Sequence, residues 1–179
     1  MCGDMMIHKE YFDIYDINEN KLGYKVLRGK PLKKGEYHIV VEVITITKEG
    51  KLLVTRRHPN KHFPLYYEFT GGSVKAGETQ LAGAKRELCE ETGIIAKDDE
   101  LIPLGTIVFK ETIYKDYLYI IDEKQDIILQ PDETIGYHFI HINNFDNFLE
   151  KYDFVPSGKK RFLDNYKGKI LDIMKEYLD

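Results

Sequence analysis

The sequence contains little cysteine, since Cys2 and Cys89 are its two thiol side chains among 179 residues. One lies beside the terminus and the other inside an expected helix, so they do not form the disulfide framework of small stapled domains. Cys89 also has no evident base to activate it as a nucleophile, and we expect it to be a small helix residue near the core. The sequence therefore does not support a disulfide-rich or thiol-dependent protein.

Long apolar runs and an excess of one charge are also missing. No segment approaches the roughly 20 apolar residues that span a bilayer, and residues 1–16 contain no apolar stretch of the signal-peptide type. We therefore expect a cytoplasmic protein without a membrane partner. The net charge of −4 disfavours binding to long DNA or RNA. It is compatible with a small phosphorylated substrate, because a metal ion can bridge the two.

The composition, with 42% hydrophobic and 31% charged residues, is typical of a soluble globular protein. Repeats, low-complexity segments and interdomain linkers are absent from the sequence, so we expect one domain over 1–179. Apolar patterns predict strands at 11–15, 22–27, 37–47, 52–57, 67–70, 101–110, 114–121 and 136–142, and late helices at 143–152 and 159–178. The first two strands flank a polar turn and predict an N-terminal hairpin at about 11–27. These patterns favour an α/β (α+β) fold, with helices on both sides of a mixed sheet.

The most informative segment runs from Gly72 to Ile94 and reads GSVKAGETQLAGAKRELCEETGI. It places Glu87, Glu90 and Glu91 at i, i+3 and i+4, so three carboxylates share one helix face. Like charges repel at this spacing unless a cation lies between them, and Mg²⁺ and Mn²⁺ prefer oxygen ligands. A solvated acidic face is the usual alternative. The accompanying glycines and arginine favour a metal site.

Local signals place these glutamates on a helix that starts near Gln80. Thr79 is expected to cap the start of this helix and Gly93 to end it. Apolar residues recur at helical spacing and would pack against the sheet: Leu81, Ala84 and Leu88. The glutamates lie off this stripe, so they can point into a cleft.

The residues before the helix predict how the preceding loop is held. Its glycines, which can take up positive φ and approach a ligand closely, are Gly71, Gly72 and Gly77. Arg86 can pair with Glu78 or with Glu90, which would hold this loop against the helix.

This segment resembles the Nudix box, G-x5-E-x7-R-E-U-x-E-E-x-G-U, where U is a bulky aliphatic residue. Every specified position is matched, by Gly72, Glu78, Arg86, Glu87, Leu88, Glu90, Glu91, Gly93 and Ile94. The resemblance implies a Nudix-type α/β/α sandwich with a mixed β-sheet. It also implies metal-dependent hydrolysis of a nucleoside diphosphate linked to another group. Homodimers are common in such proteins, and a homodimer is compatible with this sequence.

The resemblance also implies roles for individual residues. Carried over to this chain, the ligands of Mg²⁺ or Mn²⁺ are Glu90, Glu91 and the carbonyl of Gly71. Glu87 would complete the metal shell or take a proton from the attacking water, and Arg86 belongs to the same catalytic set. A diphosphate is anionic and repels nucleophiles, which explains the need for a metal. The sequence leaves open which glutamate is the general base.

Outside the box, Glu133 is the first candidate for a further acidic metal ligand, with Asp132 and Glu111 as alternatives. A solvated loop carboxylate is an equal interpretation of Glu133. Arg56 and Arg57 end a predicted strand, and neighbouring strand residues face opposite ways. One of the two should therefore face the cleft, where it could bind a phosphate beside Gly72.

Three further residues carry weaker predictions. Lys61 and Lys75 are less favoured as phosphate ligands than the two arginines. His38, in a predicted buried strand, is expected to be a core residue rather than a metal ligand.

The region upstream of the box is similar to the Nudix subgroup related to isopentenyl-diphosphate isomerase. The similar stretches are FDIYDINENKLG and GEYHIVVEVITITKEGKLLVTRR. The isomerase needs a cysteine and histidine ligands near the box, and EFTGGSV supplies neither. We therefore expect a pyrophosphohydrolase acting on a small phosphorylated substrate whose identity stays open. The alternatives are a non-catalytic nucleotide-binding or sensor domain and, less favoured, an enzyme resembling the prenyl-diphosphate isomerase.

Overall fold

The computed structural model describes residues 9–121 and 125–178, so Cys2 lies outside the described residues. The strands are β1 Tyr11–Tyr15, β2 Lys21–Leu27, β3 His38–Thr47, β4 Lys51–Arg57, β5 Tyr67–Glu68, β6 Thr70–Ser73, β7 Ile102–Phe109, β8 Thr112–Ile121 and β9 Thr134–His141. The helices are α1 Gln80–Thr92, α2 Phe145–Leu149, α3 Pro156–Arg161 and α4 Lys167–Leu178. A π-helical turn at Phe162–Tyr166 joins α3 to α4, and short 3₁₀ turns lie at Asp98–Glu100 and Ile142–Asn144. Within these described ranges, every helix is too short or too polar to cross a membrane.

A mixed sheet forms the centre of the described part of the chain. Its strand order is β5-β4-β3-β8-β7, with β6 paired to β3 and β9 paired to β4. Strands β3 and β8 run parallel, and the other ladders are antiparallel. Nearly all of β3 is buried, as its continuous β-branched sequence predicts for a strand covered on both faces.

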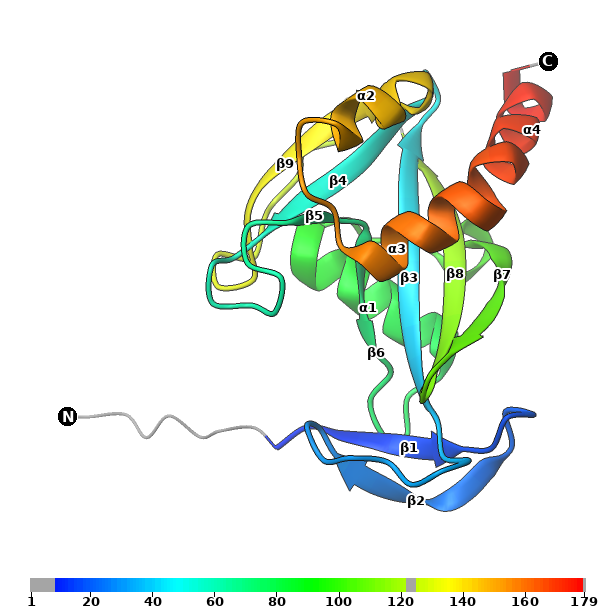
Figure 1. Cartoon of the computed structure of the whole chain (residues 1–179). Helices are drawn as coiled ribbons and strands as arrows, with labels where there is room; N and C mark the ends of the chain where they lie inside the picture. Colours follow the sequence, from blue (N-terminus) through cyan, green and yellow to red (C-terminus); the bar gives the residue numbers. More distant parts are fainter. Residues whose placement is uncertain (1–8, 122–124, 179) are drawn as a thin grey trace.

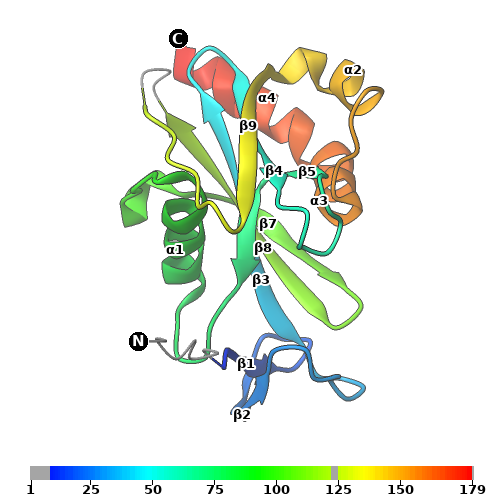
Figure 2. The ribbon, with the colours of Figure 1, turned by 90° about the vertical axis from the view of Figure 1, so that its left-hand side faces the viewer.

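Helices cover both faces of this sheet, with α1 on one side and α2, α3 and α4 on the other (Figures 1 and 2). On the α1 side, Leu88 packs in a buried cluster with Val41 of β3. On the other side, the ring of Phe145 lies 5.9 Å from that of Phe69 and 4.8 Å from that of Phe162. The predicted α/β/α sandwich with a mixed sheet is confirmed.

Strands β1 and β2 form a separate antiparallel hairpin below the main sheet (Figure 1). The loop that precedes α1 donates two backbone hydrogen bonds to this hairpin. Ala76 N lies 2.8 Å from Tyr11 O, and Gly77 N lies 2.9 Å from Asp13 Oδ2. These bonds fix the hairpin beside the segment that carries the glutamate-rich motif.

The glycines before α1 differ from their predicted role. Gly71 and Gly72 lie in strand β6, paired with β3, and have no positive φ, whereas Gly77 has a φ of 84°. Strand pairing requires extended backbone, so the missing Cβ is what matters in β6. A Cβ on Gly71 would overlap the carbonyl oxygen of Val41, and one on Gly72 would overlap the carboxylate of Glu87. Positive φ is therefore confirmed for Gly77 and wrong for Gly71 and Gly72, whose close neighbours are parts of the same chain. Close approach to a ligand stays a prediction.

Candidate active site

Helix α1 begins and ends at the predicted residues. Thr79 Oγ1 accepts a hydrogen bond from Ala82 N at 3.1 Å. Gly93 ends the helix with a left-handed φ of 72°. Ala84 and Leu88 are fully buried, so one face of α1 is fixed against the sheet and the glutamate face is oriented with it.

The prediction that Cys89 lies near the core is wrong, because its side chain is exposed. Successive residues on a helix lie about 100° apart. With Leu88 directed into the core, Cys89 is turned toward solvent.

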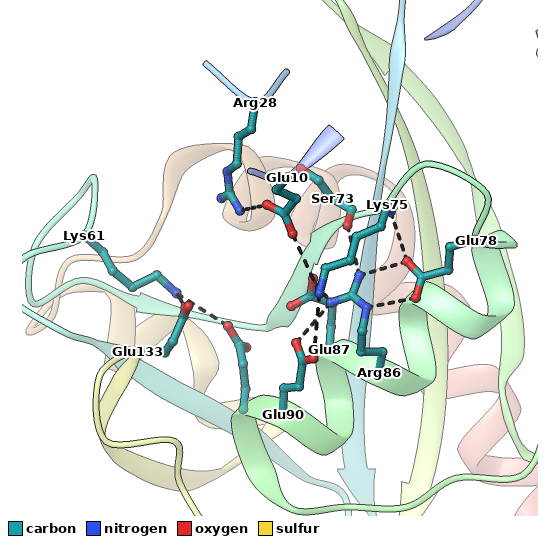
Figure 3. Close-up of polar contacts among 11 residues, drawn as sticks. Glu10, Arg28, Lys61, Ser73, Lys75, Glu78, Arg86, Glu87, Glu90 and Glu133 are labelled. Carbon is teal, nitrogen blue, oxygen red and sulfur yellow. Dashed lines mark hydrogen bonds and ion pairs between the residues drawn. The ribbon is translucent and has the colours of Figure 1, made fainter. Parts of the chain in front are cut away.

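Arg86 connects the predicted carboxylates to one another (Figure 3). Its Nε and Nη2 atoms donate to the two carboxylate oxygens of Glu78 at 2.8 and 2.9 Å, and Nη2 also donates to Ser73 O at 3.1 Å. Nη1 donates to Glu87 at 2.7 Å and to Glu90 at 3.0 Å. Burial would raise the pKa of Glu78, but the hydrogen bonds from Arg86 and from Lys75 N outweigh it and lower that pKa. Glu78 is thus an anionic anchor that holds Arg86, and through it two of the helix carboxylates.

A cavity of about 810 Å³ lies over this glutamate face. The predicted site residues that line it are Arg57, Gly71, Gly72, Arg86, Glu87, Glu90, Glu91 and Glu133, together with the weaker candidates Lys61 and Lys75. Five other predicted residues do not line it: Arg56, Glu78, Gly93, Asp132 and Glu111. The structure thus gathers residues from α1, β4, β6 and the segment before β9 into one place.

A lysine lies among the innermost carboxylates. Lys61 Nζ is 2.6 Å from Glu133 Oε2, 3.5 Å from Glu91 Oε1 and 3.7 Å from Glu68 Oε1. The side chain of Glu91 is only 3% exposed. Burial, followed by the nearby charge of Glu68, raises the pKa of Glu91 well above its usual range. The charge of Lys61 opposes this rise, so a cation beside the carboxylate favours its ionised form.

Of the two strand-end arginines, Arg57 faces the cavity and Arg56 does not. Arg57 forms an ion pair with Glu68 through Nη1 and donates from Nε to His62 O at 2.7 Å. Arg56 donates from Nε to the carbonyl of Leu65 and does not line the cavity. The expectation that one of the two faces the cleft is met by Arg57, and Arg56 is not at the site.

Sequence reasoning missed Glu68 and the contribution of the hairpin. Glu68 is buried in β5 and contacts both Arg57 and Lys61. An acidic residue between two aromatic residues in a short strand was the available signal. Arg28 and Glu10 reach the cavity from the hairpin, with 2.5 Å between Arg28 Nη1 and Glu10 Oε2 (Figure 3). Whether these two residues reach the cavity depends on how the hairpin packs against the main sheet, and no local pattern in the sequence predicts that packing.

The donors present suit a hard divalent cation. Carboxylate oxygens are the ligands that Mg²⁺ and Mn²⁺ prefer, and the buried oxygens Glu91 Oε2 and Glu68 Oε1 have no hydrogen-bond partner within the described residues. Within residues 9–121 and 125–178, no group of three or more acidic, histidine or cysteine side chains is already arranged to hold a metal ion. Arg86 and Lys61 instead lie between the carboxylates. The residue types fit the metal, and these ion pairs would have to exchange for it.

Comparison with known proteins identifies the family. A NUDIX domain model matches residues 36–165. A Nudix hydrolase of Clostridium acetobutylicum is 33% identical over 184 residues, covering 94% of this chain and 87% of that protein. A crystal structure from Deinococcus radiodurans is 21% identical and superposes with a TM-score of 0.73, covering 88% of this chain and 99% of that chain. The NUDIX domain of Shewanella oneidensis NrtR, solved with ADP ribose, is 14% identical, with a TM-score of 0.58 and coverage of 85% and 95%. The chain belongs to the Nudix hydrolases, enzymes that act on nucleoside diphosphate derivatives.

Proposed function

We propose that this Nudix hydrolase cleaves the diphosphate linkage of a small nucleoside diphosphate derivative and that the reaction depends on Mg²⁺ or Mn²⁺. One observation carries the proposal. The carboxylates of Glu87, Glu90 and Glu91 share a cavity with Arg57 and Lys61. Carboxylates suit a divalent cation, and the two basic side chains suit the phosphates that this cation would accompany.

The metal ligands would be Glu90, Glu91 and the carbonyl of Gly71, with Glu87 and Glu133 beside them. A bound divalent ion neutralises diphosphate charge and makes water a better nucleophile. Glu133 is 44% exposed and pairs with Lys61, so it would have to leave this lysine to reach a metal ion.

The basic residues divide into two roles. Arg86 is committed to three carboxylates, so it positions the glutamates rather than binding substrate. Lys61 can exchange Glu133 for a phosphate oxygen, and Arg57 presents its guanidinium to the same cavity.

Glu87 is the proposed acceptor of the proton from the attacking water. Its side chain is only 14% exposed, and burial raises its pKa above the ordinary carboxyl value, which makes it a stronger base. Arg86 Nη1 donates to Glu87 Oε1 at 2.7 Å and fixes the orientation of the carboxylate.

The test is chromatographic separation of the products formed with Mg²⁺ or Mn²⁺, because hydrolysis of a diphosphate linkage releases two phosphorylated products from each substrate. ADP ribose, the ligand of the Shewanella relative, is the first substrate to try. An oxidised nucleoside triphosphate, a dinucleoside polyphosphate and a nucleotide sugar complete the panel. Turnover of one class should fall at least about 100-fold in Glu90→Gln.

The matched control is Glu150→Gln, the same change at an exposed carboxylate, which should keep wild-type activity. Full activity in a folded Glu90→Gln variant contradicts the proposal. Tight nucleotide binding without turnover of any substrate would instead favour the sensor alternative, although a sensor has no need for every glutamate of the box.

A further inference from the structure

We propose that the N-terminal hairpin builds a second cavity, which holds the nucleoside of the substrate, and that Arg28 joins this cavity to the diphosphate site. The inference rests on the proposed function and names the part of the chain that selects the substrate. The second cavity has a volume of about 460 Å³, within the roughly 300–1,000 Å³ of small-molecule sites. Its lining residues include Phe12, Arg28, Pro31, Leu32, His38, Glu111 and Thr112.

The two cavities are adjacent. Arg28 and Ser73 line both of them, which places a ligand in the second cavity beside the catalytic cavity. Figure 3 shows Arg28 reaching from the hairpin toward the box, held by Glu10. A third, more apolar cavity of about 650 Å³ lies beside Phe109 and Arg161. It shares Glu111 and Thr112 with the second cavity but, among the described residues, no lining side chain with the catalytic cavity, so a nucleoside there would lie farther from the diphosphate site.

The lining of the second cavity matches a base and a ribose. The rings of Phe12 and His38 stack with centroids 5.0 Å apart and an interplanar angle of 21°. Burial, and then the charge of Arg28, lowers the pKa of His38, so this aromatic wall is uncharged at neutral pH. An uncharged aromatic wall suits a planar base. The carboxylate of Glu111 can accept hydrogen bonds from ribose hydroxyls.

The hairpin lies largely outside the part of the chain that defines the family. The NUDIX domain model begins at residue 36, whereas Phe12 and residues 28–32 precede it. Residues that the shared domain does not supply can differ between enzymes with the same box, which is the property expected of a specificity site.

The test fills the second cavity and leaves the catalytic cavity intact. Leu32 lines the second cavity and not the catalytic cavity, so Leu32→Trp should block binding of the nucleoside. Leu22→Trp makes the same change at a hairpin residue that is 41% exposed and lines neither cavity. Calorimetry with Mg²⁺ would measure the Kd of AMP, CMP, GMP, UMP and inorganic pyrophosphate for each protein.

We expect Leu32→Trp to weaken binding of the preferred nucleotide at least tenfold. Leu22→Trp should match the wild type, and pyrophosphate should bind all three proteins equally. Circular dichroism would confirm folding. Should Leu32→Trp fail to fold, Glu111→Gln replaces it, with an expected loss of at least threefold for the nucleotide and none for pyrophosphate.

Three results would overturn the inference: unchanged nucleotide affinity in the folded cavity variant, an equal loss of pyrophosphate affinity, or a wild type that binds pyrophosphate but no nucleotide. Failure of the proposed function is separate from these results. If the wild type is inactive but binds the nucleotide, and Leu32→Trp weakens that binding, the nucleoside site stands and the proposed hydrolysis fails.

Discussion

Removing the Arg86 side chain should destabilise the folded protein much more than removing an exposed ion pair. Arg86→Met abolishes both bonds to Glu78 and the bonds to Glu87 and Glu90. The side chains of Arg86 and Glu78 are only 18% and 16% exposed. Breaking a buried pair from one side costs about 3–5 kcal/mol, and the residual solvent contact favours the lower end. At about 2–4 °C per kcal/mol, we expect Tm to fall by about 6–12 °C.

A double-mutant cycle separates the Arg86–Glu78 pair from the other contacts of Arg86. Arg86→Met, Glu78→Gln and the double variant would be unfolded in urea and followed by far-UV circular dichroism. Two charge-assisted hydrogen bonds at 2.8 and 2.9 Å should give a coupling free energy of about 2–3 kcal/mol. This is below the sum of two isolated bonds because water partly screens the pair.

The control cycle uses Lys160 and Asp164, which also form a short ion pair, with 2.6 Å between Lys160 Nζ and Asp164 Oδ2. Their side chains are 78% and 51% exposed, so their coupling should stay within about 0.5 kcal/mol. Equal coupling energies in the two cycles would refute the argument. Arg86 would then be a solvated arginine that does not hold the preceding loop against the helix.

Three further predictions concern individual site and core residues. Gly72→Ala should fold but lose activity, because its new Cβ displaces the flexible carboxylate of Glu87. Gly71→Ala should be less stable than the wild type by at least about 2 kcal/mol, because its new Cβ meets a backbone carbonyl. Thermal unfolding compares the two variants, and equal Tm values would contradict the prediction. Burial, and then the charge of Glu68, raises the pKa of Glu91. At a pH just above the ordinary pKa of a carboxyl group, Mg²⁺ binding should therefore release protons. Calorimetry in buffers of different ionisation enthalpy counts these protons, and Glu91→Gln should release fewer. Burial raises the pKa of Glu42 from 4.5 to about 8, so the folded state holds more protons than the unfolded state. The free energy of unfolding should therefore decrease as pH rises from about 5 to 8, and it should decrease more steeply in the wild type than in Glu42→Gln. Urea unfolding at several pH values measures both slopes, and identical slopes would count against this explanation.

The sequence predicted the glutamate helix well because helix geometry is local. Thr79 and Gly93 determine its ends, and the apolar stripe through Ala84 and Leu88 determines which face is buried. Once that face is known, the spacing of the glutamates determines where they point. The position of Glu91 follows from these rules alone. Its partners do not, since they come from other elements.

The strand-end arginines show where local reasoning stopped. Alternation predicted that one of Arg56 and Arg57 faces the cleft, but the selection depends on register. The β4–β9 ladder has a register shift between these two residues. The partner of Arg57 is Glu68 on β5, which pairs with β4 only after the chain has folded. A pairing between strands cannot be derived from either strand alone.

The charges of the catalytic cavity indicate where substrate selectivity is encoded. Its acidic lining residues are Glu10, Glu87, Glu90, Glu91 and Glu133, and its basic ones are Lys9, Arg28, Arg57, Lys61, Lys75 and Arg86. A face of carboxylates alone would bind a cation and repel a diphosphate. The basic side chains that correct this imbalance come mostly from the hairpin, β4 and the following loop, and Arg86 is already occupied by glutamates. The box therefore predicts the reaction, and we infer that the elements around it select which diphosphate can approach. Changes in these surrounding elements can alter the substrate without altering a single box residue.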